Sequence, residues 1–547
     1  MRATRFSRGT IGVAGILCLG LSGLGATALA APSGPGNIDF DKTGSIVIHK
    51  HVQADNATPG TADGTETGTK GAPVAGVKFT AYPLDVDLKT KDAWDSLSNL
   101  VVSNEACGPD FRRPVEDLGG VKVKKQAQSS ESGATNDQGQ ASIGSLAVGA
   151  YLVCETEAPA NVAEKAAPFV VTVPFPNTAQ NIKNGAAANA NGQWVYDVHV
   201  YPKNVVVEAP KKDVKVVSYG LNGEAQVEFP VTATVPKIGA NTSFKHFIIS
   251  DPMDASYTSP AVKPNSVTID GVAIDPTWYK ATVNAANNEA NISFTQTGLE
   301  KLKDKAGSVI SVTFTAKTQS VSSAINNQAQ LYVDTIPGLT PPLTPPTTPP
   351  GGDTPVPSNK VVTAWGAASL LKQDSQSKQA LEGAAFEIYN AKKPWEGTCT
   401  TEIADNDPST AVDESAKVMV GGKDVFTTDA QGKFDIAGLF VDSKVGAPGV
   451  DQVAVDHTTR CYVLKEVKAP AGFTLPTGDA ALTPLKVKAG DATTANQVTV
   501  DNTKTTVPQL PLTGAAGKVL MTVGGLSLMA IAVGFVLAAR KRHVNEA

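Results

Sequence analysis

The stretch from Tyr462 to Phe473 reads YVLKEVKAPAGF, a short run of β-forming residues that ends in a Pro and Gly turn. Runs of this kind recur along most of the chain and are separated by Gly, Asn, Asp and Pro residues. Long helical periods are scarce. The pattern predicts an all-β protein, and its 547 residues suggest about three or four sandwich domains rather than one core.

Composition narrows the class of function. The chain carries a net charge of −5, and its charged residues, 18% of the total, are spread along its length. This balance favours neither nucleic-acid binding nor adsorption to a membrane surface. No Ser/His/Asp grouping, phosphate-binding glycine loop or cofactor fingerprint rises above chance. We therefore expect a protein that is not an enzyme and that needs no cofactor or metal.

The N-terminus has the three parts of a secretory signal peptide. Arginines at the start precede an apolar run over 11–24, and the small-residue site Ala28-Leu29-Ala30 follows. We expect cleavage after Ala30, which makes 1–30 a signal peptide and the mature protein a secreted one. An uncleaved membrane anchor is the alternative, but the apolar run is short for a membrane span.

The C-terminus combines an apolar run with a basic tail. Residues 519–539 are uncharged and largely apolar, and at about 1.5 Å per residue they match a hydrocarbon core of roughly 30 Å. Arg540, Lys541 and Arg542 follow, and the positive-inside rule keeps them in the cytoplasm. We therefore predict a transmembrane helix at 519–539, with the preceding chain outside the cell.

A five-residue motif lies just before this helix: Leu510-Pro511-Leu512-Thr513-Gly514. Together with the apolar run and the basic tail, it resembles the sorting signal of sortase substrates. The resemblance implies that a cysteine transpeptidase attacks the Thr513 carbonyl and cleaves the bond to Gly514. The acyl-enzyme would then await an amine.

A second motif offers that amine. Residues 194–204 read WVYDVHVYPKN and resemble the pilin motif of shaft pilins, whose lysine is the nucleophile. Pro202 interrupts strand pairing, so Lys203 should be presented at a domain edge. An ordinary solvated lysine at a strand end is the alternative. If Lys203 of one subunit attacks the acyl-enzyme formed at Thr513 of another, repetition gives a head-to-tail filament.

The opening stretch, 462–473, closely resembles the pilin E-box, with Phe473 in place of the usual tyrosine. The resemblance implies an internal amide, or isopeptide, bond between a lysine and an asparagine, promoted by a buried carboxyl group. Burial favours this reaction because it lowers a lysine pKa and raises a glutamate pKa, so that both neutral forms become available. We assign Lys372 and Asn502 to the bond and Glu466 as its promoter. A noncovalent Lys/Glu pair is the alternative.

The middle domain has no E-box. Two of its stretches resemble the collagen-adhesin sandwich that uses an aspartate promoter: 248–253 and 325–329. Strand alternation places Lys212 and Asn327 on faces shared with apolar residues, so we assign them to a second bond, with Asp251 as promoter. Two alternatives stay open, Lys215 for the lysine and Asp254 for the aspartate.

The first domain loosely repeats the third. Both have an early lysine-bearing strand, a Gly-x-x-Phe motif and a Tyr-x-x-x-Glu motif; the Gly-x-x-Phe motifs are Gly76–Phe79 and Gly383–Phe386. Lys50 and Glu155 are the first domain's candidates. We nevertheless expect no bond there, because the last strand must present Lys203 and needs a looser edge. Glu155 is then a structural remnant.

The cysteines and histidines predict crosslinks but no metal site. Cys18 leaves with the signal peptide, and the even number that remains predicts two disulfides in an oxidising compartment. Three pairings are possible, and the separation of the pairs into different domains favours Cys107–Cys154 and Cys399–Cys461. Zinc ligation is the alternative, but no C-x-x-C pair is present. His49 and His51 share a strand face without a third ligand, so we interpret them as surface residues.

The resemblance to actinomycete fimbrial subunits and to the three-domain corynebacterial shaft pilins covers essentially the whole chain. It implies a tandem of immunoglobulin-like sandwiches of the collagen-adhesin B, A and B types. The expected order is a signal peptide (1–30), an N-terminal CnaB-like domain ending in the pilin motif (31–204), a middle CnaA-like domain (205–334), a stiff Pro-rich linker (335–358), a C-terminal CnaB-like domain with the E-box (359–505) and the sorting signal (506–547).

We therefore predict the major subunit of a covalently polymerised pilus that is anchored to the cell wall and supports adhesion. The expected partners are other copies of the chain, pilus-specific and housekeeping sortases, a tip pilin, peptidoglycan, and host or bacterial surface ligands, but no nucleic acid. The main alternative is a monomeric wall-anchored adhesin, which only the motif around Lys203 separates from a shaft pilin. A tip pilin or a cell-wall enzyme fits the sequence less well.

Overall fold

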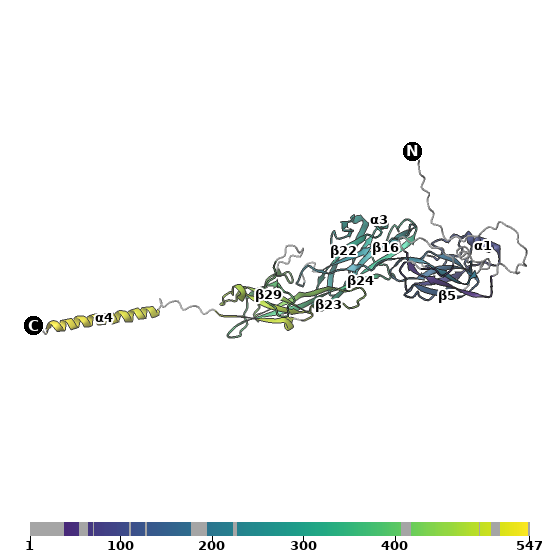
Figure 1. Cartoon of the computed structure of the whole chain (residues 1–547). Coiled ribbons are helices and arrows are strands. Elements are labelled where there is room, and N and C mark those ends of the chain that lie inside the picture. The colour runs from purple at the N-terminus through teal and green to yellow at the C-terminus, as the bar shows by residue number, and fades with distance from the viewer. Residues whose placement is uncertain are drawn as a thin grey trace, which may run out of the picture.

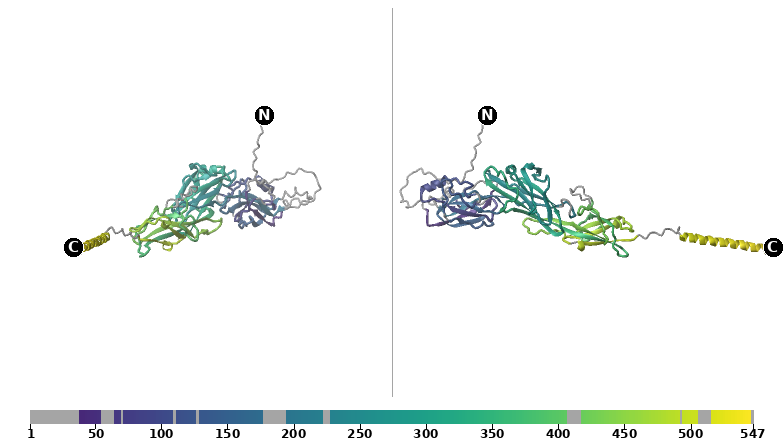
Figure 2. Two further views of the ribbon diagram at one scale, coloured as in Figure 1. Left: turned by 60° about the vertical axis from the view of Figure 1, so that its left-hand side comes forward. Right: turned by 180° about the vertical axis from the view of Figure 1, so that it is seen from behind.

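Three β-rich domains lie in a row in the computed structural model (Figures 1 and 2). The structure describes residues 38–53, 64–68, 71–108, 111–125, 128–176, 194–221, 227–405, 417–491, 493–504 and 515–544. The first domain is purple to blue in Figure 1, the middle domain teal, and the third green to yellow. The predicted all-β class is confirmed. The signal peptide, 1–30, lies outside the described residues.

The first domain contains β1 (Thr43–His49), β2 (His51–Val52), β3 (Lys78–Pro83), α1 (Lys91–Ser98), β4 (Ser130–Glu131), β5 (Gln140–Ala147), β6 (Gly149–Glu157), β7 (Val162–Glu164), β8 (Phe169–Val173), β9 (Phe175–Pro176), β10 (Trp194–Val195), β11 (Asp197–Val200) and β12 (Lys203–Val206). One sheet has the order β11-β1-β5 and the other β4-β3-β6-β8. Ile46, Phe79 and Val153 fill the core of this domain. A small sheet, β2-β12-β7, ends the domain.

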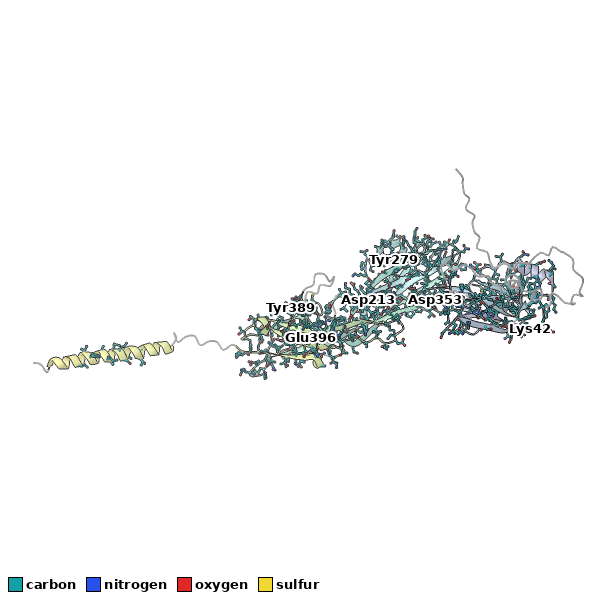
Figure 3. All side chains as sticks on the ribbon, viewed as in Figure 1. Lys42, Asp213, Tyr279, Asp353, Tyr389 and Glu396 are labelled. Carbon is teal, nitrogen blue, oxygen red and sulfur yellow. A yellow bond between two sulfur atoms is a disulfide. The ribbon has the colours of Figure 1, made fainter. Side chains whose placement is uncertain are left out.

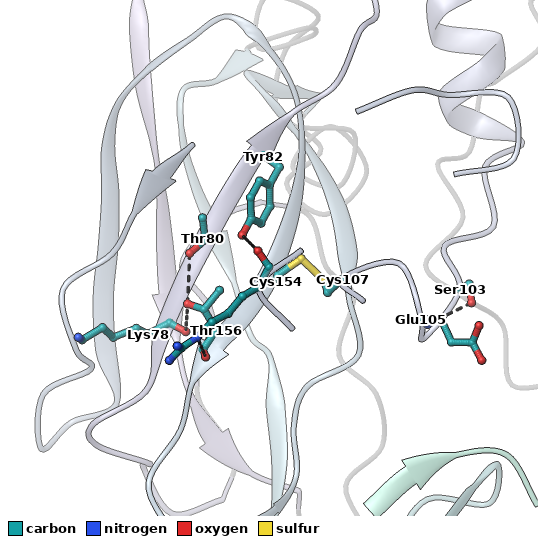
Figure 4. The surroundings of a disulfide bond; sticks show 9 residues. Lys78, Thr80, Tyr82, Ser103, Glu105, Cys107, Cys154 and Thr156 are labelled. Atoms are coloured by element: carbon teal, nitrogen blue, oxygen red, sulfur yellow. Dashed lines mark hydrogen bonds between the residues drawn. A yellow bond between two sulfur atoms is a disulfide. The ribbon is translucent and has the colours of Figure 1, made fainter. Parts of the chain in front are cut away.

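The long segment between β3 and β4 carries a second apolar cluster. The N-cap of α1 is Thr90, whose side chain accepts a hydrogen bond from the Ala93 amide. Leu97 of this helix belongs to the same cluster as Leu152 of β6. Cys107 in the segment is bonded to Cys154 of β6, which confirms the predicted pairing (Figure 4). The disulfide therefore fastens this insertion to the strand that also carries Glu155.

The middle domain contains β13 (Lys211–Lys212), β14 (Lys215–Val216), β15 (Val227–Thr234), β16 (Thr242–Pro252), β17 (Tyr257–Val262), β18 (Thr268–Ile269), β19 (Val272–Ala273), η2 (Pro276–Trp278), β20 (Tyr279–Asn284), β21 (Glu289–Phe294), α3 (Gln296–Lys303), β22 (Val309–Thr318), β23 (Ser322–Pro337) and β24 (Val356–Asp374). One sheet follows the order β13-β15-β22-β18-β19. The other includes β20-β21-β16-β23-β24. Phe229, Phe247 and Phe314 are buried in the core of the domain.

The third domain continues from β24, which runs on out of the middle domain. Its other elements are β25 (Ala385–Asn390), β26 (Lys417–Val418), β27 (Phe426–Thr427), β28 (Lys433–Val445), β29 (Thr459–Lys468), η3 (Gly478–Ala481), β30 (Leu482–Lys488), η4 (Thr493–Asn496) and β31 (Gln497–Asn502). β28 and β31 flank β24, and the second sheet has the order β26-β25-β29-β30. The predicted Cys399–Cys461 disulfide is present.

The Pro-rich segment, 335–358, differs from the predicted linker. β23 and β24 lie on either side of it and pair antiparallel, from Ser322 opposite Trp365 to Leu331 opposite Val356. Between them, the Thr347 carbonyl accepts a hydrogen bond from Thr282 of β20, and Asp353 (labelled in Figure 3) lies 3.4 Å from His246 of β16. The segment is therefore a strap on the middle domain and does not separate that domain from the third. Prolines break the ladder locally, but pairing between the flanking strands closes the loop.

A short segment of the middle domain packs directly on the third. Leu221 donates a backbone hydrogen bond to Gly438 and accepts one from Gly421, and the Tyr219 carbonyl accepts from Phe440. A Cβ on Gly220 would lie only 2.0 Å from the backbone carbonyl oxygen of Met419, so glycine is needed for this close approach. The guanidinium of Arg460 lies 4.9 Å from the Tyr219 ring. These contacts and the shared strand β24 join the two domains.

The C-terminal helix α4 runs from Ala515 to Val544 and covers the predicted apolar run. In the part of the chain that the structure describes, no helix is both long and apolar enough to cross a membrane.

Candidate functional site

The third domain buries three side chains that contact one another. Lys372 donates from Nζ to Glu466 Oε2 at 2.8 Å and to Asn502 Oδ1 at 2.6 Å, and Asn502 donates from Nδ2 to Glu466 Oε1 at 2.9 Å. All three side chains are buried. Burial lowers the pKa of Lys372, although Glu466 acts in the opposite direction. The lysine, acid and asparagine assigned from the sequence are thus brought together in one closed cluster.

Strand pairing explains this convergence. β24 and β31 run parallel, and Lys372 lies opposite Val500 while Asp374 lies opposite Asn502. Lys372 therefore comes from the domain's first strand and Asn502 from its last. Glu466 reaches them from β29 of the facing sheet. An amide between the two outer members would tie the beginning of the domain to its end.

The middle domain holds an equivalent cluster with an aspartate. Lys212 donates from Nζ to Asp251 Oδ2, and Asn327 donates from Nδ2 to the same oxygen at 3.3 Å. Burial lowers the pKa of Lys212 and raises the pKa of Asp251. Asp251 Oδ1 is buried and has no hydrogen-bond partner among the described residues. A protonated Asp251 would therefore suit this site.

The two alternatives for the middle domain do not join the cluster. Lys215 is exposed on β14, where it lies opposite Glu228. Asp254 is also exposed and accepts a hydrogen bond from the Ser256 amide in a turn. The geometry therefore favours Lys212 and Asp251 over these residues.

The first domain contains a cluster of the same kind, although the sequence predicts no bond in this domain. Lys50 donates to Glu155 Oε2 at 2.8 Å, and Asn204 donates from Nδ2 to Glu155 Oε1 at 2.7 Å. Lys50 is 0%, Glu155 1% and Asn204 1% exposed. Burial lowers the pKa of Lys50 to about 8 against the opposing effect of Glu155. Glu155 is thus the centre of a complete lysine, acid and asparagine set.

A phenylalanine beside each lysine is the sequence signal that could have found the first cluster. Lys50 lies 5.5 Å from the ring centroid of Phe79, and Lys372 lies 5.4 Å from that of Phe386. These rings are the Phe residues of the repeated Gly-x-x-Phe motif. In the middle domain, Lys212 lies 4.5 Å from Phe229. Each ring helps to desolvate the amine beside it.

The pilin motif forms the last edge of the first domain. Its strands β11 and β12 pair with β1 and β2, and Pro202 lies between them, as the interruption by proline predicted. Lys203 is half-buried and lies opposite His51 in the β2–β12 pair. Burial lowers the pKa of Lys203. The acceptor candidate is therefore partly accessible, and burial increases the neutral fraction of its amine.

The histidines near this edge are buried, which corrects the expectation that they lie on the surface. His49 is 3% and His51 4% exposed, because β5, β11 and β12 cover them. His49 Nε2 lies 2.9 Å from His199 Nδ1. No group of three or more His, Cys, Asp or Glu side chains in the described ranges could hold a metal ion.

The sorting signal Leu510–Gly514, with Thr513, lies outside the described residues. The comparisons with known proteins bear on it directly. Residues 502–546 match the family model of the LPXTG cell wall anchor motif, and residues 41–205 match that of the Gram-positive pilin subunit D1, N-terminal domain. Together with the tandem sandwiches, these matches define a Gram-positive pilin subunit that carries a cell-wall anchor.

Two relatives match almost the whole chain. Fimbrial subunit type 2 of Actinomyces naeslundii is 38% identical over 539 residues, which cover 97% of this chain and 96% of that protein. Fimbrial subunit type 1 of Actinomyces viscosus is 30% identical over 569 residues, which cover 99% of both chains. The chain belongs to this family of fimbrial subunits. It is a structural shaft subunit of a fimbria anchored to the cell wall at the cell surface.

Solved structures agree with this assignment. The full-length major pilin SpaD of Corynebacterium diphtheriae is similar with a TM-score of 0.58 and 25% identity, covering 86% of this chain and all of that one. The C. diphtheriae major pilin SpaA shares the fold with a TM-score of 0.54 and 21% identity, over 84% of this chain and all of that one.

Proposed function

We propose that the subunits are joined by an amide bond between Thr513 of one copy and Lys203 of the next, and that internal Lys–Asn amides reinforce each subunit. The observation that supports the internal bonds is the recurrence of a buried lysine, acid and asparagine cluster in all three domains. In the middle and third domains, the clusters consist of the residues that we assign from the sequence. For the first domain it extends the proposal to Lys50 and Asn204.

The internal reaction requires no enzyme, cofactor or oxidant. In the third domain, neutral Lys372 Nζ attacks Cγ of Asn502, the bond from Cγ to Nδ2 breaks, and ammonia leaves as the new amide forms. Glu466 hydrogen-bonds both reacting groups, so it can take a proton from the amine and deliver one to the leaving nitrogen. Burial supports this chemistry because it lowers the pKa of Lys372.

The same scheme applies to the other two clusters. In the middle domain, the raised pKa of Asp251 favours a protonated acid that can polarise the Asn327 carboxamide. In the first domain, Lys50 has a pKa of about 8, so a useful fraction of its amine is neutral near pH 7. Glu155 contacts both Lys50 and Asn204, as Glu466 does in the third domain.

Polymerisation is a transpeptidation carried out by a sortase. The enzyme's thiolate takes the Thr513 acyl group and releases Gly514 with the C-terminal segment. Neutral Lys203 Nζ then attacks the thioester, the C–S bond breaks, the thiol leaves, and the amine loses a proton as the amide forms. Pilus-specific sortases would join subunits in this way, and a housekeeping sortase would join the last subunit to peptidoglycan. A tip pilin and surface ligands complete the proposed partners.

The placement of the bonds suits a filament under tension. A noncovalent domain is stabilised by only about 5–15 kcal/mol, which is little protection for a fibre one molecule thick. An amide from Lys372 to Asn502 passes force from β24 to β31 without unfolding the sheets between them. We propose this mechanical role for the three clusters, in support of adhesion by the fimbria.

An immunoblot of cell-wall extracts boiled in detergent and reductant tests the polymer. Wild type should give a ladder of high-mass species, and Lys203→Ala should leave only monomer. Lys215→Ala removes an exposed lysine outside the motif and should keep the ladder. A ladder that survives in Lys203→Ala would show that another lysine is the acceptor, and monomer in all three strains would favour a monomeric wall-anchored adhesin.

A further inference from the structure

Three aromatic rings cluster in the segments next to the acceptor lysine. His49 stacks on Tyr201, with ring centroids 4.8 Å apart and an interplanar angle of 15°, and its edge faces the edge of His199, whose ring centroid lies 5.1 Å away. His49 Nε2 and His199 Nδ1 are 2.9 Å apart, a hydrogen-bond distance. Tyr201 is two residues before Lys203. The stack therefore connects β1 directly to the chain that presents the acceptor.

Tyr201 also contacts the segment that contains Thr65 and Thr67. The Tyr201 hydroxyl accepts from the Thr67 amide at 2.6 Å and lies 3.3 Å from the Thr65 carbonyl. The His199 amide donates to Gly64. Among the described residues, β12 is paired by two short ladders: β2 pairs with Lys203 and Asn204, and β7 pairs with Val205 and Val206. Lys203 thus lies between Tyr201, which the stack holds, and Asn204, which the buried Glu155 cluster holds.

We propose that His49 is a positioning residue for Lys203, and that protonation of His49 loosens the chain around Tyr201 that presents the acceptor. This inference rests on the proposed role of Lys203 as the intersubunit acceptor. In this proposal, His49 does not contact the sortase or the acyl group. His49 positions Lys203 through Tyr201 and the residues that follow it.

The hydrogen bond between the two imidazoles limits how many protons the pair can carry. One ring nitrogen must accept while the other donates, so the bond is lost when both rings are protonated. Two cations would then face each other. The surrounding charges do little to stabilise a protonated pair. Lys203 disfavours the charged form of both His49 and His51, and Lys50 disfavours that of His51, whereas Glu66 favours a charged His49.

The direction of the pH effect follows from the pKa shifts. Burial, and then the charge of His199, lowers the pKa of His49; burial also lowers the pKa of His51, whose Nδ1 is buried without a partner among the described residues. Below about pH 6.5 the unfolded chain therefore binds more protons than the folded edge does. The edge is fully stable above that pH and loses stability as the pH falls below it.

A coupling assay tests the inference on the mature full-length protein. A purified pilus sortase joins a fluorescent LPLTG peptide to Lys203, and the initial rate is measured from pH 8 down to pH 5, the range in which histidine titrates. His49→Phe keeps a stacking ring but removes the hydrogen bond and the titration. His457→Phe is the matched control, because His457 also stacks on a ring, that of Trp395 in the third domain, at 4.7 Å.

At neutral pH, His49→Phe should couple within about twofold of wild type, and below pH 6 it should exceed wild type by about tenfold, because it lacks the proton-linked release. His49→Ala should be slow at every pH, and His457→Phe should follow wild type, which also corrects for the pH dependence of the sortase. Identical pH profiles for wild type and His49→Phe would overturn the inference. Labelling that persists in Lys203→Ala would instead overturn the proposed function.

Hydrogen exchange on the wild-type protein gives an independent test in case a variant fails to fold. Peptides covering 199–206 should lose protection as the pH falls below about 6.5, after correction for intrinsic exchange. Peptides covering β31, 497–502, should not, since no histidine lies on that strand. Constant protection of 199–206 across this range would also overturn the inference.

Discussion

The first and third domains contain the same kind of cluster, but the strands that carry the asparagine are paired to different extents. Asn502 ends β31, which pairs with β24 over six consecutive positions, and both of its amide atoms are bonded. Asn204 lies on the four-residue β12 between two short ladders, and its Oδ1 has no partner in the described part of the chain. The last strand of the third domain is therefore held more firmly than that of the first. The first domain must keep Lys203, next to Asn204, accessible to an enzyme.

Removing the promoter should have the largest effect and should sharpen this comparison. Glu466→Ala should abolish the Lys372–Asn502 bond and leave a buried lysine without an acidic partner, at a cost of about 3–5 kcal/mol beyond the lost crosslink. Intact-mass measurement should show a gain equal to one retained ammonia, after correction for the substitution, and calorimetry should show a lower Tm.

Glu155→Ala is the matched change in the first domain. It should also retain one ammonia, but calorimetry should show that only the transition of the first domain moves. If the mass of Glu155→Ala differs from that of the wild type only by the substitution, Glu155 does not promote a bond between Lys50 and Asn204, and the two domains differ in chemistry as well as in edge structure.

The disulfides provide a second comparison, because each fastens the strand that carries a promoter. Cys107–Cys154 closes a separation of 47 residues and Cys399–Cys461 one of 62, so each should stabilise its domain by about 4 kcal/mol on the loop-entropy model. Replacing either pair with serine should lower the Tm of that domain alone. Because Cys154 directly precedes Glu155, loss of the first pair should also slow isopeptide formation, which mass spectrometry after refolding can follow.

The smallest expected effect is the pH dependence of the first cluster without its crosslink. In Asn204→Ala, Lys50 keeps a lowered pKa of about 8 against an ordinary 10.5. Between these values the unfolded state holds the extra proton, so stability should rise with pH, by about 3 kcal/mol at most. Chemical denaturation at both ends of this window measures the rise, and Lys50→Met in the same background should remove it.

Sequence reasoning reached the third-domain residues because the E-box places Glu466 in a nearly complete motif and Asn502 in the terminal strand. It reached Lys212, Asp251 and Asn327 through strand alternation but could not separate them from Lys215 and Asp254. That choice depends on which strand faces which across the sandwich. The first-domain cluster was missed because its E-box is degenerate, and because Asn204 was interpreted only as the neighbour of Lys203.

The sequence by itself determined the all-β class, the two disulfides, the pilin motif around Lys203 and the anchor region, because local composition, spacing and short motifs carry that information. The tertiary structure alone decided that 335–358 is a strap on the middle domain, that Lys50, Glu155 and Asn204 meet, and that His49 and His51 are buried. Each of these depends on contacts between segments that are far apart in the chain, such as β2 with β12 and β20 with the strap. Long-range pairing follows from how whole sheets pack, which no local pattern records.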